Sequence, residues 1–325
     1  MFGWHSRFVV IVMNHISSGS QLGPYELEAL IGKGGTGEVY RAHDSRLNRR
    51  VALKVLAPEF TTDADRLARF TQEARTTALL NHPNVIAVYD VGTHLGVPFV
   101  VSELLEGETL RARIAGGALP LSTALTYGLE LARGLVAAHS LGITHRDLKP
   151  ENVFVTRDDR VKILDFGLAT CREAALACAG PDSSTSSGGG MVGTIGYAAP
   201  EQVRGGAADH RSDIFSFGVV LYEMIAGAAP FRRNAPIDTI IAILNSDPPP
   251  LLGRQRIPHH VNAIVRHCLE KKPSARFQSA HDLAFSVDLA LRWMNESRSV
   301  SARVAWRAFS RAVLPNTVAA MLHLF

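Results

Sequence analysis

Short apolar runs that alternate with polar residues occur in the first third of the chain, and this period of two predicts β-strands. The clearest run is Val51–Leu56, which reads Val-Ala-Leu-Lys-Val-Leu and predicts a half-buried strand with one lysine inside it. Further strands are predicted at Tyr25–Ile31, Glu38–Ala42, Ile86–Val91 and Pro98–Val101.

Longer stretches with apolar residues every three to four positions predict helices. Arg66–Leu80 is one such stretch, and the proline in residues 82–85 ends it because proline disfavours a helical conformation in the residue before it. Leu121–Ser140 is another, stopped by Gly142. Further helices are predicted at Ile214–Ala226, after the capping residues 209–213, and onward to about Trp293.

Composition places the chain among ordinary globular proteins. Its 325 residues favour about two domains, and 46% apolar with 20% charged residues supports a sizeable core. The net charge of +4 and the pI near 9.1 are mildly basic. Because much of the arginine is local, this charge supports a nucleic-acid partner only weakly, and no nucleic acid is expected.

The cysteines and apolar runs favour a cytoplasmic location. Cys171, Cys178 and Cys268 are an odd number without a CxxC pair, which is typical of a reducing compartment. A redox role for the first two is the less favoured alternative. No segment reaches the roughly 18 apolar residues that a membrane-spanning helix needs. The apolar run Phe8–Met13 is shorter than a signal-peptide core, and Met13 is an alternative start of the chain.

Two polar stretches carry the candidate chemistry. Residues 145–152 read His-Arg-Asp-Leu-Lys-Pro-Glu-Asn, and residues 165–167 read Asp-Phe-Gly. A carboxylate can take a proton from a hydroxyl nucleophile, and a second carboxylate with an amide oxygen can hold hard divalent cations. A lysine can neutralise charge on a phosphoryl group in transfer. This inventory suits phosphoryl transfer.

In this order and at this spacing, the two stretches resemble the catalytic loop and metal loop of protein kinases. The resemblance extends from Tyr25 to Leu291 and implies an α+β, bilobal protein-kinase fold. Residues 193–197 and 199–203, Gly-Thr-Ile-Gly-Tyr and Ala-Pro-Glu-Gln-Val, are similar to the bacterial Hanks-type branch. The implied organisation is an unstructured extension at 1–24, a small antiparallel-sheet lobe with one helix at 25–102, a larger mainly helical lobe at 107–292, and a basic amphipathic tail at 293–325.

The resemblance also implies an activity, ATP-dependent transfer of a phosphoryl group to protein Ser and Thr hydroxyls in signal transduction. Asp147 is expected to orient and deprotonate the hydroxyl, and Lys149, the serine/threonine mark of the family, to contact the γ-phosphate. Asn152 and Asp165 are expected to hold Mg²⁺, with Mn²⁺ as an alternative.

A glycine-rich stretch, residues 31–39, joins the first two predicted strands. Glycines let backbone N–H groups approach phosphates without a Cβ clash. A dinucleotide-binding turn has the same spacing but leads into a helix, whereas Glu38–Ala42 continues as a strand, which favours a hairpin lid. The implied nucleotide contacts are Ile31, Gly32, Lys33, Gly34, Gly35, Thr36, Gly37, Glu38 and Val39. Thr36 stands where kinases often carry an aromatic residue.

Lys54 is the lysine inside the predicted strand Val51–Leu56. Burying an ammonium costs free energy unless it is paired, and Glu73 is the only acidic residue of the helix Arg66–Leu80. A Lys54–Glu73 ion pair is therefore expected to hold Lys54 against the nucleotide phosphates. The alternative is an edge strand with Lys54 in solvent.

Residues 102–107, Ser-Glu-Leu-Leu-Glu-Gly, resemble the hinge between kinase lobes. Backbone groups near Glu103 and Leu105 are then expected to bind adenine beside a small gatekeeper, Ser102. Thr77 stands where kinases usually pack a larger apolar residue against the phenylalanine of residues 165–167, which implies looser helix docking.

The activation segment implied by the resemblance runs from Asp165 to Glu201. Its residues 181–190 are polar and of low complexity, a composition that cannot bury enough apolar surface to order itself. Arg146 beside the catalytic Asp147 is a fixed charge that pairs best with a phosphate, so autophosphorylation within a transient homodimer is expected. A serine-rich spacer without regulatory role is the alternative. The candidate acceptors are Thr170, Ser183, Ser184, Thr185, Ser186 and Ser187.

Two structural anchors are implied as well. Glu201 is expected to pair with Arg276, and Asp213 to hold the backbone of the catalytic loop. In the tail, arginines recur every four residues at 303, 307 and 311, on a different helical face from Trp306 and Phe309. A helix packed on the catalytic domain is the favoured interpretation. The alternatives are a peripheral membrane contact and a truncated juxtamembrane region or disordered tail.

Two other functions remain open. A pseudokinase scaffold would bind partners without catalysis, yet every catalytic position is filled. A small-molecule kinase of the aminoglycoside type would share a sparse version of the catalytic loop, but it would not need the peptide-seating residues 199–201.

Overall fold

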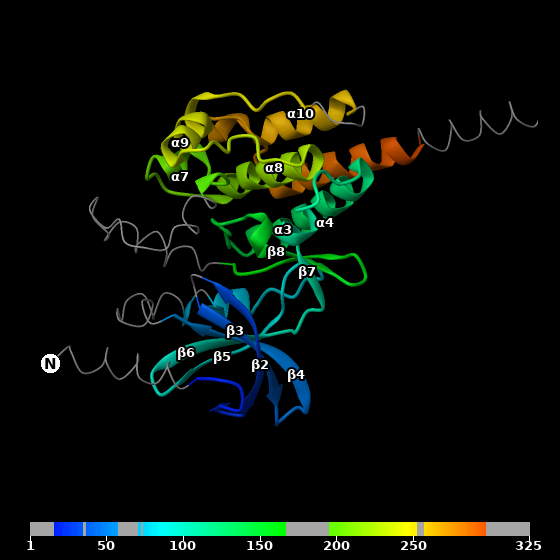
Figure 1. Ribbon diagram of the computed structural model, residues 1–325. Helices are drawn as coiled ribbons and strands as arrows, with labels where there is room; N and C mark the ends of the chain where they lie inside the picture. Colours follow the sequence, from blue (N-terminus) through cyan, green and yellow to red (C-terminus); the bar gives the residue numbers. More distant parts are fainter. Residues whose placement is uncertain are drawn as a thin grey trace, which may run out of the picture.

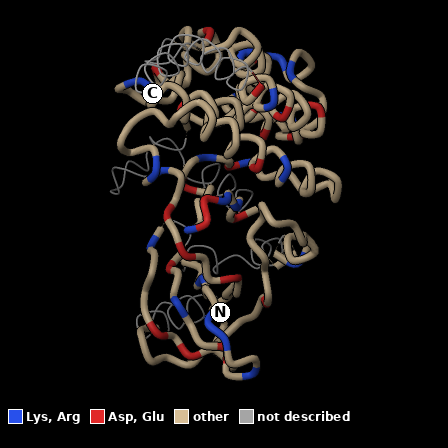
Figure 2. The backbone as a smooth tube through the Cα atoms, turned by 90° about the vertical axis from the view of Figure 1, so that its right-hand side faces the viewer, with Lys and Arg blue, Asp and Glu red and all other residues tan. Residues whose placement is uncertain are grey.

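The computed structural model describes residues 16–34, 37–57, 71–72, 74–166, 195–251 and 257–296. Its two parts lie one above the other in Figure 1, a sheet-rich small lobe coloured blue to cyan and a helical large lobe coloured green to orange. Acidic and basic positions are interspersed over both lobes in the view of Figure 2. The bilobal α+β fold expected from the sequence is confirmed.

The small lobe is built on one antiparallel sheet with the strand order β1-β2-β3-β4-β6-β5. Every strand predicted from alternation is present, and all of them except β5 bury apolar side chains in the lobe's core. The strands are β1 (Gln21–Leu22), β2 (Tyr25–Gly34), β3 (Gly37–Asp44), β4 (Arg49–Leu56), β5 (Val88–His94) and β6 (Val97–Ser102).

The glycine-rich stretch forms the predicted hairpin. Strands β2 and β3 pair antiparallel, with Gly32 opposite Val39 and Gly34 opposite Gly37. Gly37 has a φ of +145°, and a Cβ there would lie 2.0 Å from the carbonyl oxygen of Val55. Only glycine fits this close approach of β3 to β4.

The N-terminal boundary lies earlier than expected. Strand β1 falls within residues 1–24, and Gly19 N–H donates to Leu27 O at 2.7 Å, so the expectation of an unstructured extension is wrong for residues 16–24. Of the predicted helix Arg66–Leu80, residues 71–72 and 74–77 are described and helical.

The large lobe packs around two long helices, α4 (Leu121–Ser140) and α8 (His210–Ala226), both at their predicted positions. Helix α8 is buried on almost every side. Its N-cap Asp209 accepts a hydrogen bond from Arg211 N–H at 2.8 Å, as the capping residues predicted. The remaining elements are α3 (Leu110–Arg113), η2 (Pro150–Asn152), α7 (Pro200–Val203), α9 (Pro236–Asn245), α10 (His259–Cys268), η3 (Pro273–Ala275) and a last helix over residues 280–296.

A small second sheet lies where the lobes meet (Figure 1), formed by β7 (Gly107–Thr109), β8 (Val153–Thr156) and β9 (Val161–Ile163). The small-lobe segment 84–86 hydrogen-bonds to β9. Ile86 N–H donates to Ile163 O at 3.0 Å, and Ile163 N–H donates to Asn84 O at 2.9 Å. These bonds fix the small lobe to the large lobe along one seam.

The last helix continues through residue 296, past the tail boundary that the sequence placed at 293. The basic pattern of the tail at 303–311 lies outside the described residues. Within the described part of the chain, no helix is long and apolar enough to cross a membrane.

Candidate active site

The loop that carries Asp147 is held by a buried carboxylate in the first turn of α8. Asp213 Oδ2 accepts the backbone N–H of His145 at 2.7 Å, and Oδ1 accepts that of Arg146 at 2.8 Å. The ring Nε2 of His139 lies 2.9 Å from the same Oδ2. The predicted role of Asp213 as the anchor of this loop is confirmed.

His145 joins this loop to the segment of Asp165. Its Nε2 donates to Leu164 O at 2.8 Å, and its Nδ1 accepts Asp147 N–H at 3.2 Å. Arg146 and Asp165 have φ values of 66° and 54°. A non-glycine residue in this region costs on the order of 1–3 kcal/mol, and the buried contacts of Asp213 and His145 hold both loops in place against that cost.

Three of the predicted catalytic and metal-binding residues meet at Asp147. Lys149 Nζ lies 2.7 Å from Asp147 Oδ2. Asn152 Nδ2 donates to the backbone oxygen of Asp147 at 2.8 Å and lies 3.4 Å from its Oδ2. The carboxylate of Asp147 is thus positioned by an ammonium and an amide from the turn that follows it.

Lys54 lies opposite Asp165. The lysine is in the middle of β4, and its Nζ is 2.7 Å from Asp165 Oδ2, with 14% of the lysine side chain exposed. The buried ammonium therefore has a carboxylate partner from the large lobe, which the sequence did not predict. Glu73, the partner expected from the sequence, lies outside the described residues, so that pair stays a prediction.

The donor set at this place fits a divalent cation. The carboxylate of Asp165 and the amide oxygen of Asn152 are hard oxygen donors of the kind that Mg²⁺ and Mn²⁺ accept. Among the described residues no group of three or more His, Cys, Asp or Glu could hold a metal ion. A cation here would draw its other ligands from phosphate oxygens and water, as Mg²⁺ sites usually do.

Of the nine hairpin residues expected to contact the nucleotide, seven are described in the structure. Gly35 and Thr36 lie outside the described residues. Lys33 and Glu38 face each other across the two strands with an Nζ to Oε1 distance of 2.8 Å. Ile31 is half exposed and Val39 partly buried.

The hinge residue Glu103 has a structural side chain. Its Oε1 accepts Ala87 N–H at 2.8 Å and Lys162 Nζ at 2.7 Å, and its own N–H donates to Ala87 O at 3.0 Å. Its N–H is therefore already used, and the adenine contacts expected near Glu103 and Leu105 stay predictions.

Thr77 is buried against Phe166, as its sequence position implied. Its hydroxyl lies 3.5 Å from the backbone oxygen of Phe166, and both residues are almost fully buried. A polar contact of Thr77 thus stands where kinases usually pack a larger apolar side chain, and the looser helix docking stays a prediction.

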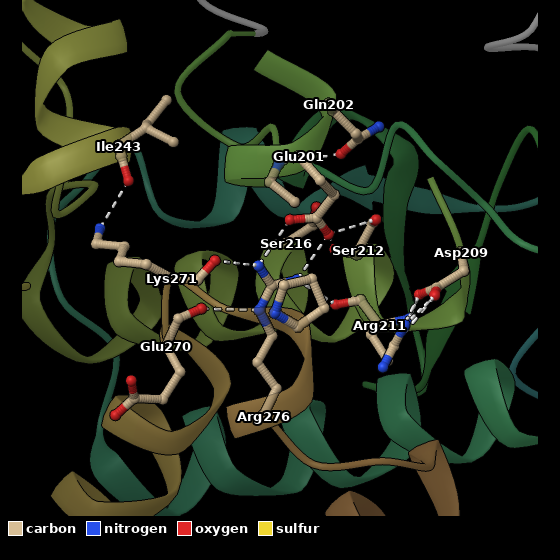
Figure 3. A network of polar contacts seen from close by, with 12 residues as sticks. Glu201, Gln202, Asp209, Arg211, Ser212, Ser216, Ile243, Glu270, Lys271 and Arg276 are labelled. Carbon is tan, nitrogen blue, oxygen red and sulfur yellow. Dashed lines mark hydrogen bonds and ion pairs between the residues drawn. The ribbon is translucent and has the colours of Figure 1, made fainter. Parts of the chain in front are cut away.

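Within the large lobe, Glu201 and Arg276 form the predicted pair (Figure 3). Two guanidinium nitrogens each lie 2.8 Å from a Glu201 oxygen, and Ser212 Oγ donates to Oε1 at 2.7 Å. Burial would raise the pKa of Glu201, but the hydrogen bonds from Arg276 and Ser212 hold it below its usual value. Glu201 therefore remains ionised against a fully buried guanidinium.

Other polar residues of the site were not found from the sequence. Gln202 accepts Ala199 N–H at 3.0 Å and donates to Arg146 O at 2.8 Å, which joins residues 199–202 to the catalytic loop. Arg111 contacts Glu151, Tyr197 and Glu223 from α3. Their partners are distant in sequence, so no local pattern could have revealed them. The acceptors of the activation segment, Thr170 and residues 183–187, lie outside the described residues.

Comparison with known proteins gives consistent matches. The family model described as protein kinase domain matches residues 25–285. A probable serine/threonine-protein kinase of Clostridium perfringens is 36% identical over 299 residues, which are 90% of this chain and 42% of the relative. Serine/threonine-protein kinase PknA of Mycobacterium tuberculosis is 39% identical over 271 residues, 82% of this chain and 61% of the relative.

A solved structure agrees in fold. The crystal structure of the Mycobacterium tuberculosis PknI kinase domain matches with a TM-score of 0.66 and 27% identity, over 84% of this chain and 98% of that one. The chain spans about 40% of the length of the Clostridium and Streptomyces relatives.

Proposed function

The chain belongs to the protein kinase domain family, and from that premise we propose that it transfers the γ-phosphoryl group of ATP to Ser and Thr hydroxyls of proteins. The observation that carries the proposal is the meeting of Lys54 and Asp165 from two lobes beside the Asp147–Lys149–Asn152 group. The relatives in Clostridium and Mycobacterium are named serine/threonine-protein kinases.

Asp147 is the proposed base. A new bond forms between the acceptor oxygen and the γ-phosphorus, the bond to the β-phosphate bridging oxygen breaks, and the hydroxyl proton passes to the Asp147 carboxylate. Lys149 and Asn152 keep this carboxylate in position. Because Lys149 Nζ adjoins the proposed base, it would also neutralise charge on the phosphoryl group.

Lys54 and the glycine hairpin are proposed to hold the nucleotide. The Lys54 ammonium points to the junction of the lobes, where it can bind phosphate oxygens while Asp165 keeps it in place. Asn152 and Asp165 would hold Mg²⁺ or Mn²⁺, which would neutralise phosphate charge when bound. The backbones of Glu103 and Leu105 are the proposed adenine contacts.

The test is transfer of radiolabel from [γ-³²P]ATP by the purified chain. We expect label on Ser and Thr of a generic basic protein, dependent on divalent cation, and no label on aminoglycosides or other small alcohols. Label on the small alcohols alone would favour the small-molecule kinase, and no label on any acceptor despite nucleotide binding would favour a pseudokinase scaffold.

Regulation and location follow from the same proposal. We propose that a transient homodimer phosphorylates the activation segment, because Arg146 adjoins the proposed base and the segment is rich in acceptors.

A contact of the basic tail with an anionic membrane surface would be seen as vesicle binding that a chain ending at residue 296 loses.

A further inference from the structure

Arg111 in α3 bridges two carboxylates. Its Nε lies 2.8 Å from Glu151 Oε1, and its Nη1 lies 2.8 Å from Glu223 Oε1. Its Nη2 donates to the hydroxyl of Tyr197, and that hydroxyl donates to Glu223 Oε2 at 2.5 Å. One guanidinium is therefore bonded to groups from η2, α8 and the segment 195–199.

Two residues of this bridge, Glu151 and Tyr197, belong to segments that adjoin the loop of the proposed base. Glu151 follows Lys149 in the turn that positions Asp147. Tyr197 belongs to the segment that Gln202 joins to Arg146 O at 2.8 Å. Helix α3 lies near the junction of the lobes, next to β7 and β8 (Figure 1). A peptide that brings its hydroxyl to Asp147 between these segments would pass close to Arg111.

Part of the bridge is open to solvent. The side chain of Arg111 is 31% exposed and that of Glu151 is 45% exposed, whereas Glu223 is buried. Burial and the adjacent Glu223 carboxylate raise the pKa of Tyr197, so its hydroxyl stays a neutral donor. Burial would lower the pKa of Arg111, but the hydrogen bonds that Arg111 donates to Glu223 and Glu151 outweigh this effect and raise the pKa.

We propose that Arg111 sets the charge specificity of the enzyme by occupying, from within the chain, a subsite that would otherwise bind a cationic side chain of the substrate. The proposal rests on the proposed function. Two carboxylates that converge beside a peptide path attract Arg and Lys. With the partly exposed Arg111 between them, one of the two negative charges is neutralised and both carboxylates already have a cationic partner, so a cationic side chain of the peptide is disfavoured.

The experiment measures kcat/KM for peptides that share one Ser or Thr acceptor and carry Arg, Gln or Glu at each flanking position in turn. We expect that Arg111→Gln raises the Arg-to-Gln ratio at one or more positions about tenfold over the wild type. The double variant Arg111→Gln with Glu151→Gln should return the ratio toward the wild-type value. An unchanged ratio at every position, or a rise that persists in the double variant, would overturn the proposal.

A second variant covers the case in which Arg111→Gln does not fold because Glu223 loses its partner. Glu151→Lys changes only a half-exposed carboxylate and adds a cation beside Arg111. Its Glu-to-Gln ratio should rise at the same position, and an unchanged ratio contradicts the proposal. A wild-type chain that phosphorylates no peptide at all refutes the proposed function and this inference together, whereas an active wild type with unshifted variants refutes only the inference.

Discussion

Lys54 Nζ and Asp165 Oδ2 lie 2.7 Å apart and join the small lobe to the large lobe across 111 positions of sequence. The pair lies at the junction where the proposed nucleotide phosphates would bind. The ammonium that we propose contacts phosphate and the carboxylate that we propose holds the cation thus position each other.

Lys54→Met should therefore lower kcat/KM about 100-fold or more, because it removes the phosphate contact and the partner of Asp165 together. Steady-state kinetics at saturating divalent cation would measure the loss.

Glu73→Gln should act through the predicted Lys54–Glu73 ion pair, so the double variant of Lys54→Met and Glu73→Gln should be little worse than either single variant. Fully additive losses would show that Lys54 and Glu73 are uncoupled.

Asp147→Asn should abolish transfer and leave nucleotide affinity nearly unchanged, because the proposed base acts only in the chemical step. Removal of a general base usually costs roughly 10²-fold or more. Single-turnover transfer and the Kd of a fluorescent ATP analogue would separate the two effects. Retention of more than about a tenth of wild-type turnover would contradict the role.

Arg276→Met should destabilise the large lobe by about 3–5 kcal/mol, since it leaves the Glu201 carboxylate buried without its charge partner. Urea unfolding would measure the change in the free energy of unfolding. Arg157→Met is the matched control, because its ion pair with Glu106 is mostly exposed, at 77% and 64% of the two side chains. We expect the control to lie within about 1 kcal/mol of the wild type, and equal losses in both variants would contradict the assigned role.

Lys271 should make stability depend on alkaline pH. Burial lowers the pKa of its ammonium to about 8, while the group donates to Ile243 O at 2.8 Å and lies 4.0 Å from the centre of the Phe231 ring. Between this pKa and the ordinary value of about 10.4, the unfolded chain binds more protons than the folded one, so stability rises with pH.

The comparison variant is Lys271→Met, in which this contribution is absent. Between about pH 8 and pH 10.4 the free energy of unfolding of the wild type should rise relative to that of the variant. Below this window the difference between them should be constant. Curves that stay parallel throughout would show that Lys271 keeps its ordinary pKa in the folded chain.

Phosphatase-treated enzyme should show a lag in ATP-dependent activity that shortens as the enzyme concentration increases, because phosphorylation between two copies is bimolecular. A variant with alanine at all six acceptors should not regain activity after phosphatase treatment. These acceptors are Thr170, Ser183, Ser184, Thr185, Ser186 and Ser187. A six-alanine variant as active as the wild type, with no lag in either, would refute the switch.

Much of the fold could be predicted because its signals are local. Alternation predicted strand β4, although the structure buries residues on both of its faces rather than on one. Glycines followed by a strand indicated the β2–β3 hairpin. The catalytic loop was found from the order and spacing of its residues. These features depend on residue types that lie close together in sequence.

The rest depends on contacts that no local pattern contains. Glu73 was expected to pair with Lys54 because it is the only acidic residue of the predicted helix Arg66–Leu80, and that pair stays a prediction. The partner that the structure shows, Asp165, lies 111 positions away from Lys54. The bridge of Arg111 joins α3 to α8 through Glu223, which lies 112 positions from Arg111. The sequence predicted an adenine contact from the backbone of Glu103. It did not predict that the Glu103 carboxylate accepts hydrogen bonds from Ala87 N–H and Lys162 Nζ.

The seam between segment 84–86 and β9, continued by the Glu103–Lys162 pair, determines how the lobes can move. A rotation that preserves these bonds must pivot at the seam, so displacement grows with distance from it. In the register of the sheet, Ser102 lies opposite Ala52, and Gly37 lies opposite Leu56, on the second strand away. Gly37 therefore lies about 10 Å from Ser102 across the strands and about 13 Å along them. The glycine hairpin is thus far from the pivot. A small turn at the seam becomes a larger opening where a nucleotide would enter and leave.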